Sequence, residues 1–360
     1  MIRFRGLIVA TIAAVAMGVV GTGNAAAETA TSSTKITERA PLFKDFRTAV
    51  DVHLEAKVIP DPGATKLREL NNTKLNLPKD LTFSTEGTPV CEKDIGQINP
   101  ENANRSTEAV IAECPDSVVG GGTAVINVAG LVAAPITDPV LTVFNGGKDA
   151  QGDPILLIHG YSATVLPGGH GIPMKGSLKN GVLDVSVPTL AANSAVTEFT
   201  FDLPGTVGRD QNYSQAKCST GSWSSNAVLT LGRYDPNTGT YVDKIDLVTD
   251  PTTQTCTGLP GKARFGSVKV KGPKSVKKGK KGTYKVTVKN IGTAIAKGVK
   301  IAASGKGASG KASGGNIAPG ASKTISVKVK FSKKGTAKVK FKATASKVSA
   351  KTGTFKVKVK

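Results

Sequence analysis

The C-terminal part of the chain, residues 262–360, places lysines and apolar residues at alternate positions in several short stretches. In "ISVKVKF", residues 325–331, the odd positions are apolar and the even positions are Ser or Lys. Because successive side chains of a β-strand point to opposite faces, such a stretch has one core face and one solvent face. The pattern recurs in "YKVTVKN", "AKVKFKATA" and "FKVKVK", with Gly, Pro and Ser between the stretches. Residues 266–360 are therefore expected to form an antiparallel β-sandwich.

The charge of this region is of one sign. Residues 262–360 contain 28 of the 48 Lys and Arg of the chain and none of its 26 Asp and Glu, so residues 1–261 carry a net charge of −6. A boundary between two domains is thus expected near residues 258–266, where composition and charge change together. A few lysines protect exposed strands from aggregation. A field of one sign works against compact folding, which favours a polyanionic partner.

The solvent face of the predicted strands supplies the candidate binding residues for such a partner. They are Lys328, Lys330, Lys338, Lys340, Lys342, Lys356 and Lys358. In a Gram-positive envelope the candidate partners are teichoic or teichuronic acids, acidic polysaccharide, anionic lipid and extracellular DNA. Sequence-specific nucleic-acid recognition is not expected, since Arg264 is the single arginine of residues 262–360 and the aromatic residues of this region fall on the core side. A purely structural domain with solubilising lysines is the alternative.

A family resemblance accompanies this pattern. "GTYKVTVKNIGTAIAKGVKIAAS" and "NIAPGASKTISVKVKF" resemble the bacterial immunoglobulin-like modules called cell-adhesion-related, or CARDB-like, domains. The residues that carry the resemblance are Asn290, Gly292, Ala294, Ala296, Pro319, Gly320 and Ser322. It covers roughly residues 266–360 and implies an immunoglobulin-like fold. The high lysine content departs from the usual pattern, so the resemblance implies no particular partner.

The N-terminus has the features of a secretory signal peptide. Arg3 and Arg5 form a basic segment, Leu7 to Val20 an apolar core, and Ala25 to Ala27 a small-residue site, so cleavage is expected between Ala27 and Glu28. The apolar core is shorter than the ~20 residues that span a bilayer, and no later stretch is longer. We expect a secreted chain without a transmembrane segment, held at the cell wall, if at all, by non-covalent contacts.

Four cysteines fit an oxidising compartment. Of the three possible pairings, the pairing of neighbours is preferred, namely Cys91 with Cys114 and Cys218 with Cys256. A zinc site is not expected, because the chain has no C-x-x-C spacing and no histidine close in sequence to a cysteine.

Residues 46–258 are expected to form a second, disulfide-bonded β-sandwich, after a flexible segment at 28–45 and before a linker at 259–265. "AVDVHLEAKVI" alternates like a strand, Asn180-Gly181 is typical of a hairpin turn, and "YDPNTGTY" of a longer one. Only residues 104–114 have a convincing helix start. Through "LPKDLTF", "AECPDSVVGGGTA" and "LTVFNGG", this region resembles a family of secreted actinobacterial proteins of unassigned function. That resemblance implies a disulfide-bonded sandwich and no catalytic residue.

The segment "PILLIHGYSATVLPGGHG" tests whether this domain is a hydrolase. His159, Ser162 and His170 are the residue types of an α/β-hydrolase site, but Thr164 stands where G-x-S-x-G needs its second glycine. No histidine follows His170, so the expected order of the triad cannot be completed. We expect no catalytic residue and no cofactor. A hydrolase or a carbohydrate-binding module remains the alternative for this domain.

Two turns contain oxygen ligands of the kind that calcium prefers. The groups are Asn145, Asp149 and Asp153 in one turn and Asp235, Asn237 and Asp243 in the other. Neither has the EF-hand spacing, and turns select Asn and Asp for backbone reasons. No metal site is therefore expected, and the glycines of "VVGGGTAV" indicate a strand bulge rather than a phosphate loop.

Overall fold

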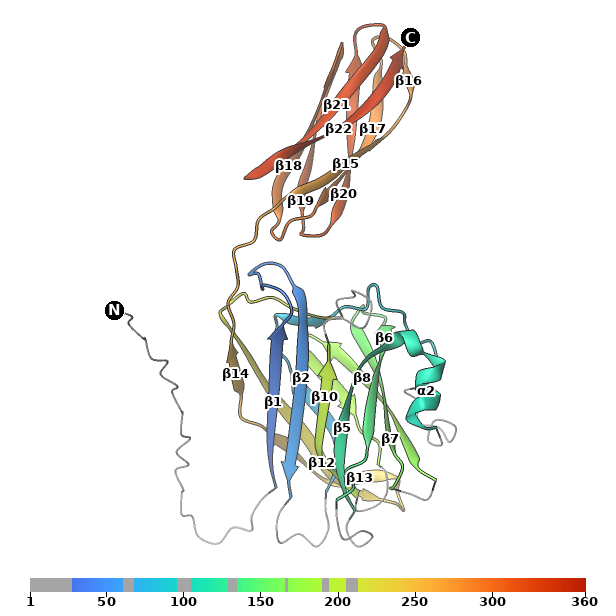
Figure 1. Cartoon of the computed structure of the whole chain (residues 1–360), viewed down its shortest axis with the longest axis vertical. Coiled ribbons are helices and arrows are strands. Elements are labelled where there is room, and N and C mark those ends of the chain that lie inside the picture. Colours follow the sequence, from blue (N-terminus) through green and yellow to red (C-terminus); the bar gives the residue numbers. More distant parts are fainter. Residues whose placement is uncertain are drawn as a thin grey trace, which may run out of the picture.

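The chain forms two all-β domains in a computed structural model (Figure 1). The structure describes residues 28–60, 68–95, 105–128, 135–165, 168–189, 194–204 and 213–360. One sheet has fourteen strands and the other eight, which confirms the prediction of two β-sandwiches. The predicted signal peptide, residues 1–27, lies outside the described residues, as does Ala27 at the predicted cleavage position.

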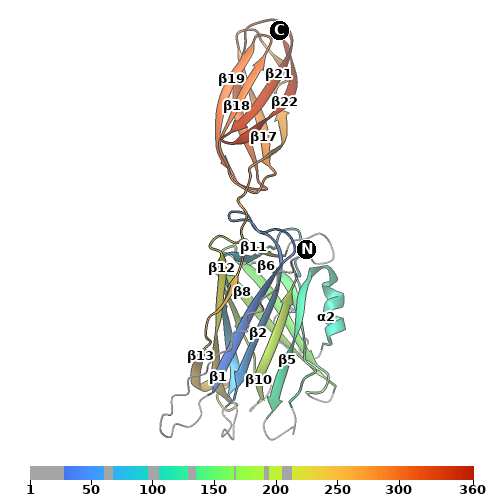
Figure 2. The ribbon, with the colours of Figure 1, turned by 60° about the vertical axis from the view of Figure 1, so that its left-hand side comes forward.

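The N-terminal domain contains the larger sheet. Its strands are β1 (Thr29–Glu38), β2 (Thr48–Ile59), β3 (Glu69–Asn76), β4 (Leu81–Phe83), β5 (Val118–Val128), β6 (Val140–Lys148), β7 (Pro154–Ser162), β8 (His170–Lys179), β9 (Val182–Ser186), β10 (Ser194–Leu203), β11 (Ser214–Ala216), β12 (Ser222–Asp235), β13 (Thr240–Val248) and β14 (Thr252–Thr255). Their order is β13-β12-β3-β9-β8-β7-β6-β5-β10-β2-β11-β4, with β1 on β2 and β14 on β12. Figure 2 shows β1, β2, β10 and β5 side by side.

The large sheet folds back on itself, so that β1 meets the segment after β13 and strand β14. The Ser32 and Thr249 hydroxyls lie 2.6 Å apart. The Gln254 side chain bonds both backbone groups of Ile36: its Oε1 accepts from the N–H at 2.9 Å, and its Nε2 donates to the carbonyl at 2.7 Å. Inward-facing apolar residues of most strands form one core cluster between the two halves of the sheet.

The expectation of a flexible segment at residues 28–45 was wrong, because β1 lies in this range. It pairs with β2 along its whole length, from Thr29 opposite Ile59 to Glu38 opposite Val50. Ile36 is 2% exposed, and the Glu28 carboxylate accepts a hydrogen bond from Arg68 at 2.9 Å. The segment is mostly polar, so its alternation is weak. Backbone pairing and the Gln254 amide hold it in place.

Local signals in the sequence give the expected turns and the expected helix. Asn180 and Gly181 have φ values of 53° and 84°, which a two-residue hairpin turn between β8 and β9 requires. Helix α2 (Thr107–Glu113) begins at Ser106, whose hydroxyl accepts from the Ala109 N–H. The predicted bulge lies at the start of β5, where the pairing with β6 shifts register between Val118 and Gly120. A short 3-10 turn, η1 (Pro115–Ser117), follows α2.

The described residues contain no helix with the length and apolar character needed to cross a membrane.

The C-terminal domain is a sandwich of two layers. Its strands are β15 (Phe265–Lys271), β16 (Ser275–Val276), β17 (Lys281–Asn290), β18 (Ala296–Gly305), β19 (Ala308–Ile317), β20 (Ser322–Phe331), β21 (Gly335–Ala345) and β22 (Val348–Val359). One layer contains β15, β17 and β20, and the other β18, β21, β22 and β16. Strand β19 pairs along β18, and its ladder with β20 is limited to the pairs Ala308–Phe331 and Ser309–Lys330.

The predicted alternation is confirmed in the C-terminal core. Val327, Val329 and Phe331 of β20 are 0% exposed, and the serine and lysines between them are exposed. Tyr284 of β17 contacts Phe331 in its own layer and Phe341 and Phe355 in the other, with ring centroids 5.5 to 6.3 Å apart.

The predicted linker, residues 259–265, is structured at both ends. Leu259 donates from its N–H to the Leu42 carbonyl at 2.9 Å and pairs with Phe43. Phe265 begins β15 and is 4% exposed in the C-terminal core. Leu259 is held by backbone hydrogen bonds although its side chain is 45% exposed, whereas Phe265 packs in the C-terminal core. Lys262 and Arg264 also hydrogen-bond to the C-terminal domain, so the segment between Leu259 and Lys262 connects the two sandwiches.

Replacing Gln254 by alanine tests whether β1 is an integral strand. The variant loses both hydrogen bonds to Ile36, so we expect the free energy of unfolding to fall by about 1 to 2 kcal/mol. The Ile36 amide should exchange hydrogen faster than in the wild type. Denaturant unfolding and hydrogen exchange measure the two effects. Gln151→Ala, at an exposed loop position, is the control; an equal loss there would contradict the assignment.

Candidate functional site: the lysine faces of the C-terminal domain

Every basic side chain of residues 262–360 is exposed. The segment contains no Asp or Glu, so these side chains have no acidic partner within the domain. The alternation explains the exposure, because the residues between the lysines fill the core. The domain therefore presents unpaired positive charge to solvent.

Fourteen of the seventeen lysines in the strands of this domain define two faces. The β17 face contains Lys269, Lys271, Lys281, Lys285, Lys289, Lys328 and Lys330, which lie on β15, β17 and β20. The β21 face contains Lys300, Lys311, Lys338, Lys340, Lys342, Lys356 and Lys358, which lie on β18, β19, β21 and β22. The apolar side chains of both layers meet in one core, so the two faces point in opposite directions.

The seven lysines predicted from the sequence therefore do not form one site. Lys328 and Lys330 lie on the β17 face, and the other five lie on the β21 face. Alternation shows which side chains point outward from a strand, but it does not show which layer contains that strand. The remaining lysines of the β17 face were missed, although "YKVTVKN" has the same alternation.

Several lysines lie directly opposite one another on neighbouring strands. Lys338 of β21 is paired with Lys356 of β22, and on the other face Lys281 is paired with Lys330. Like charges in these positions destabilise a sheet. Along β21, Lys338, Lys340 and Lys342 follow one another at every second residue, a repeat of ~6.6 Å in an extended strand. Each face therefore presents lysine side chains at regular spacings along and across its strands.

The hydrolase-like segment has another role in the structure. His159 is 0% exposed within β7. The Ser162 hydroxyl donates to Asp138 Oδ1 at 2.7 Å and accepts from the backbone N–H groups of Thr164 and Val165. His170 lies opposite Ser162 on β8, and no side-chain hydrogen bond joins these two described residues. Ser162 therefore fixes the turn that leaves β7.

Hydrogen bonding sets the ionisation of Asp138. Partial burial acts to raise its pKa, but the hydroxyls of Ser162 and Thr164 and two backbone N–H groups outweigh this effect. The pKa of Asp138 therefore lies below its usual value. The carboxylate is an anchor for the turn at residues 162–165.

The two acidic turns considered for calcium also use their side chains within the chain. Asp149 Oδ1 accepts from the N–H groups of Gln151 and Asp153, and Asp235 Oδ1 from the Asn237 N–H. Among the described residues, no group of three or more His, Cys, Asp or Glu side chains is placed to hold a metal ion. The geometry is that of ordinary turns.

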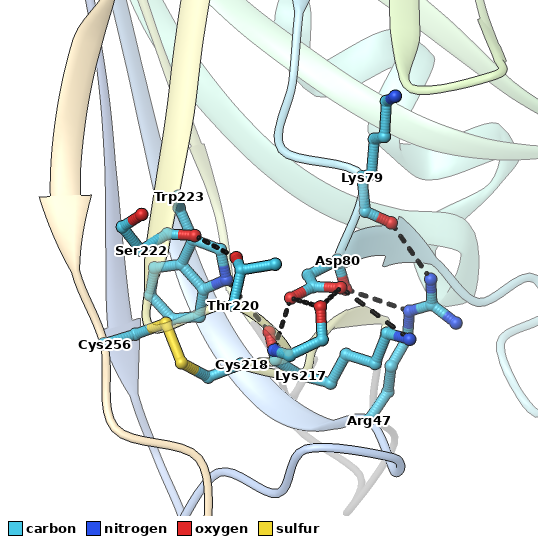
Figure 3. Close-up of polar contacts among 10 residues, drawn as sticks. Arg47, Lys79, Asp80, Lys217, Cys218, Thr220, Ser222, Trp223 and Cys256 are labelled. Carbon is cyan, nitrogen blue, oxygen red and sulfur yellow. Dashed lines mark hydrogen bonds and ion pairs between the residues drawn. A yellow bond between two sulfur atoms is a disulfide. The ribbon is translucent and has the colours of Figure 1, made fainter.

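Both predicted disulfides are present, Cys91–Cys114 and Cys218–Cys256. The segment at Cys218 is anchored by a polar cluster that the sequence did not reveal (Figure 3). Asp80 accepts from the Ser219 N–H and hydroxyl and lies 3.7 Å from the Lys217 ammonium. Arg47 donates to the carbonyls of Asp80 and Lys79.

The Trp223 indole N–H donates to the Lys217 carbonyl next to this cluster. The bonds from Ser219 and the nearby Lys217 ammonium pair the carboxylate of Asp80, which is 7% exposed. Asp80 therefore has a structural role. The signal for the cluster is absent from the sequence because Asp80 and Ser219 are 139 residues apart.

Comparison with known proteins supports the resemblance of the C-terminal domain. The CARDB family model matches residues 267–350. No curated protein matches the chain. Among solved structures, the chain is similar to red sea bream transglutaminase, with 11% identity and a TM-score of 0.24 over 91% of this chain and 31% of that one. The chain is also similar to domains 4 and 5 of the S-layer protein SbsC, with 16% identity and a TM-score of 0.23. This match covers 61% of this chain and 96% of the SbsC chain.

The chain thus spans about a third of the transglutaminase. Both structural similarities are too low to carry an argument about this protein.

The cross-strand pair Lys338–Lys356 allows a test of charge repulsion in the free domain. Lys356→Glu replaces a repulsive cross-strand pair by an attractive one, so it should stabilise the C-terminal domain by about 0.5 to 1 kcal/mol at low salt. The gain should shrink in ~1 M salt. Unfolding of the full chain measures it. Lys306→Glu, in the turn between β18 and β19, is the control, and an equal gain there would show that only net charge matters.

Asp138→Ala should weaken the fold in a pH-dependent way. The lowered pKa of Asp138 means that its contribution is present above the unfolded value of ~3.9 and is lost as the pH falls through the folded value. At pH 7 the variant should be less stable by about 1 kcal/mol, and near pH 3 the difference should shrink. Urea unfolding at both pH values tests this, with exposed Asp250→Ala as the control. A constant difference would contradict it.

Proposed function

We propose that this chain is a secreted, non-enzymatic protein of the cell envelope whose C-terminal domain binds anionic polymers. The observation that carries the proposal is the exposure of 28 basic side chains in a domain without a single Asp or Glu. Such a surface attracts polyanions and releases their counterions on binding.

The placement of the lysines favours binding over solubility alone. A soluble surface mixes charges of both signs, and a few lysines protect sheet edges. Here the lysines are opposite one another in Lys338–Lys356, Lys281–Lys330 and Lys271–Lys285, at a cost to the fold. A bound anion would relieve this repulsion on either face.

The chemistry of the faces supports binding by charge rather than by sequence or sugar identity. Lysine is a compact point charge, whereas bidentate readout of bases uses arginine. The rings of Tyr284, Phe331 and Phe341 are buried, so they are not available to stack on bases. Teichoic acid, acidic polysaccharide and extracellular DNA share the required feature, which is a linear array of anions.

Two opposite faces allow one domain to hold two polymer chains. Each face has seven lysines on neighbouring strands, and the core separates the faces. A protein of this kind would link polymers as well as bind them.

The envelope location is supported by the predicted signal peptide and by the two disulfides, which persist in oxidising compartments. The match of residues 267–350 to CARDB, a cell-adhesion-related family, supports a role at the cell surface.

Salt dependence tests the proposal. The affinity of the full chain for duplex DNA, a dense polyanion, should fall on the order of 10³ to 10⁵-fold between 50 and 200 mM salt if ~6 to 10 lysines neutralise phosphates. Teichoic acid, with a lower charge density, should respond less. Fluorescence anisotropy measures both. The proposal would be contradicted if neither polymer bound in 50 mM salt, or if binding did not depend on salt. The lysines would then serve only to keep the protein soluble.

Three sets of five Lys→Gln changes separate the faces from net charge. The β21 set is 338, 340, 342, 356 and 358, the β17 set is 281, 285, 289, 328 and 330, and the control set, mainly in turns, is 274, 277, 278, 306 and 347. Each face set should remove one polymer site and abolish cross-linking, measured as turbidity. The control set should retain both sites. Equal losses from all three sets would contradict binding at the faces.

A further inference from the structure

A cavity of about 60 Å³ lies between the two halves of the N-terminal sheet. The described residues that line it come from β3, β5, β6, β7, β8, β9 and β10 and from the segments beside them. All are apolar residues, proline or glycine, with the exception of Thr73. The cavity is independent of the lysine faces and of the function proposed for them.

The core side chains around the cavity are not fully covered. Ile172, Met174, Phe199 and Phe201 belong to the apolar core and line the cavity, yet they keep 8 to 9% of their surface exposed. Core residues of the C-terminal domain such as Phe331 are 0% exposed. The N-terminal core therefore has unfilled space at this place.

Thr73 supplies the one polar group of the cavity. Its side chain is 3% exposed, and its Oγ1 has no hydrogen-bond partner among the described residues. The neighbouring Lys74 is exposed on the other side of β3, so Thr73 points inward. A buried hydroxyl without a partner is unfavourable, and a ligand oxygen at this position would satisfy it.

Water does not fit this cavity well. A buried water makes two to four hydrogen bonds, and the lining offers one hydroxyl among apolar side chains. Apolar cavities of this kind stay dry and take up apolar molecules. The space holds roughly four to six heavy atoms, if one water-sized sphere needs ~10 to 15 Å³.

We propose that this cavity binds a short alkyl molecule that carries a single oxygen, with the alkyl group among Ile172, Met174 and Phe199 and the oxygen bonded to Thr73 Oγ1. Val187, Pro188 and Val196, which also line the cavity, are half-buried.

Met174 provides a direct probe of the site. The chain has three methionines, and the other two, Met1 and Met17, lie in the predicted signal peptide. Protein labelled with [methyl-13C]methionine should show a methyl signal that Met174→Leu removes, while any signals of Met1 and Met17 remain. Addition of 1-butanol should shift this signal saturably, with a Kd on the order of 1 mM. A linear, non-saturating shift would overturn the proposal.

Chain length tests the size of the ligand. From ethanol to 1-butanol the affinity should rise about fourfold per methylene, as each added group is buried. It should fall for 1-octanol, which exceeds the space. Affinity that continues to rise to 1-octanol would contradict a ligand of this size.

Thr73→Val tests the oxygen. The change keeps the shape of the side chain and should weaken 1-butanol binding about fivefold, as expected for one lost hydrogen bond, while xenon binding stays the same. Thr142→Val, at a buried threonine that does not line the cavity, is the control and should leave both affinities unchanged. Equal 1-butanol binding in Thr73→Val and wild type would refute the role of the hydroxyl.

Discussion

The packing of two apolar layers against each other is the constraint on which the C-terminal domain depends. Tyr284 of β17 lies against Phe341 and Phe355 of the opposite layer, and every second residue of the main strands follows it into the core. Because neighbouring positions on a strand point in opposite directions, the lysines can only point outward. The core thus determines the shape of the charged surface as well as the fold.

This arrangement places like charges closer together than a stable sheet favours. Cross-strand lysine pairs occur on both faces, and the domain offers no carboxylate to relieve them. The hydrophobic core must offset this repulsion in the free protein. The anionic polymer that we propose as a partner would act in the same direction as the core, so its binding would stabilise this domain.

The core of the N-terminal domain is packed in a different way from that of the C-terminal domain. Its long sheet folds back on itself, and the amide of Gln254 joins β1 to the other end. The side chains between the two halves do not fill the space beside Met174 and Thr73. A small apolar cavity therefore remains between the two halves of the sheet, and the hydroxyl of Thr73 is its polar group.

The sequence by itself determined the all-β class, the alternation in the C-terminal domain and the turn at Asn180-Gly181, and it favoured, among three possible pairings, the cysteine pairing that the structure contains. These features rest on local periodicity, backbone preference and spacing along the chain. Only the tertiary structure placed Lys328 and Lys338 on opposite faces, brought the polar strand β1 into the sheet and joined Asp80 to Ser219. Those features depend on which strands become neighbours, and contacts between residues far apart in the chain decide that.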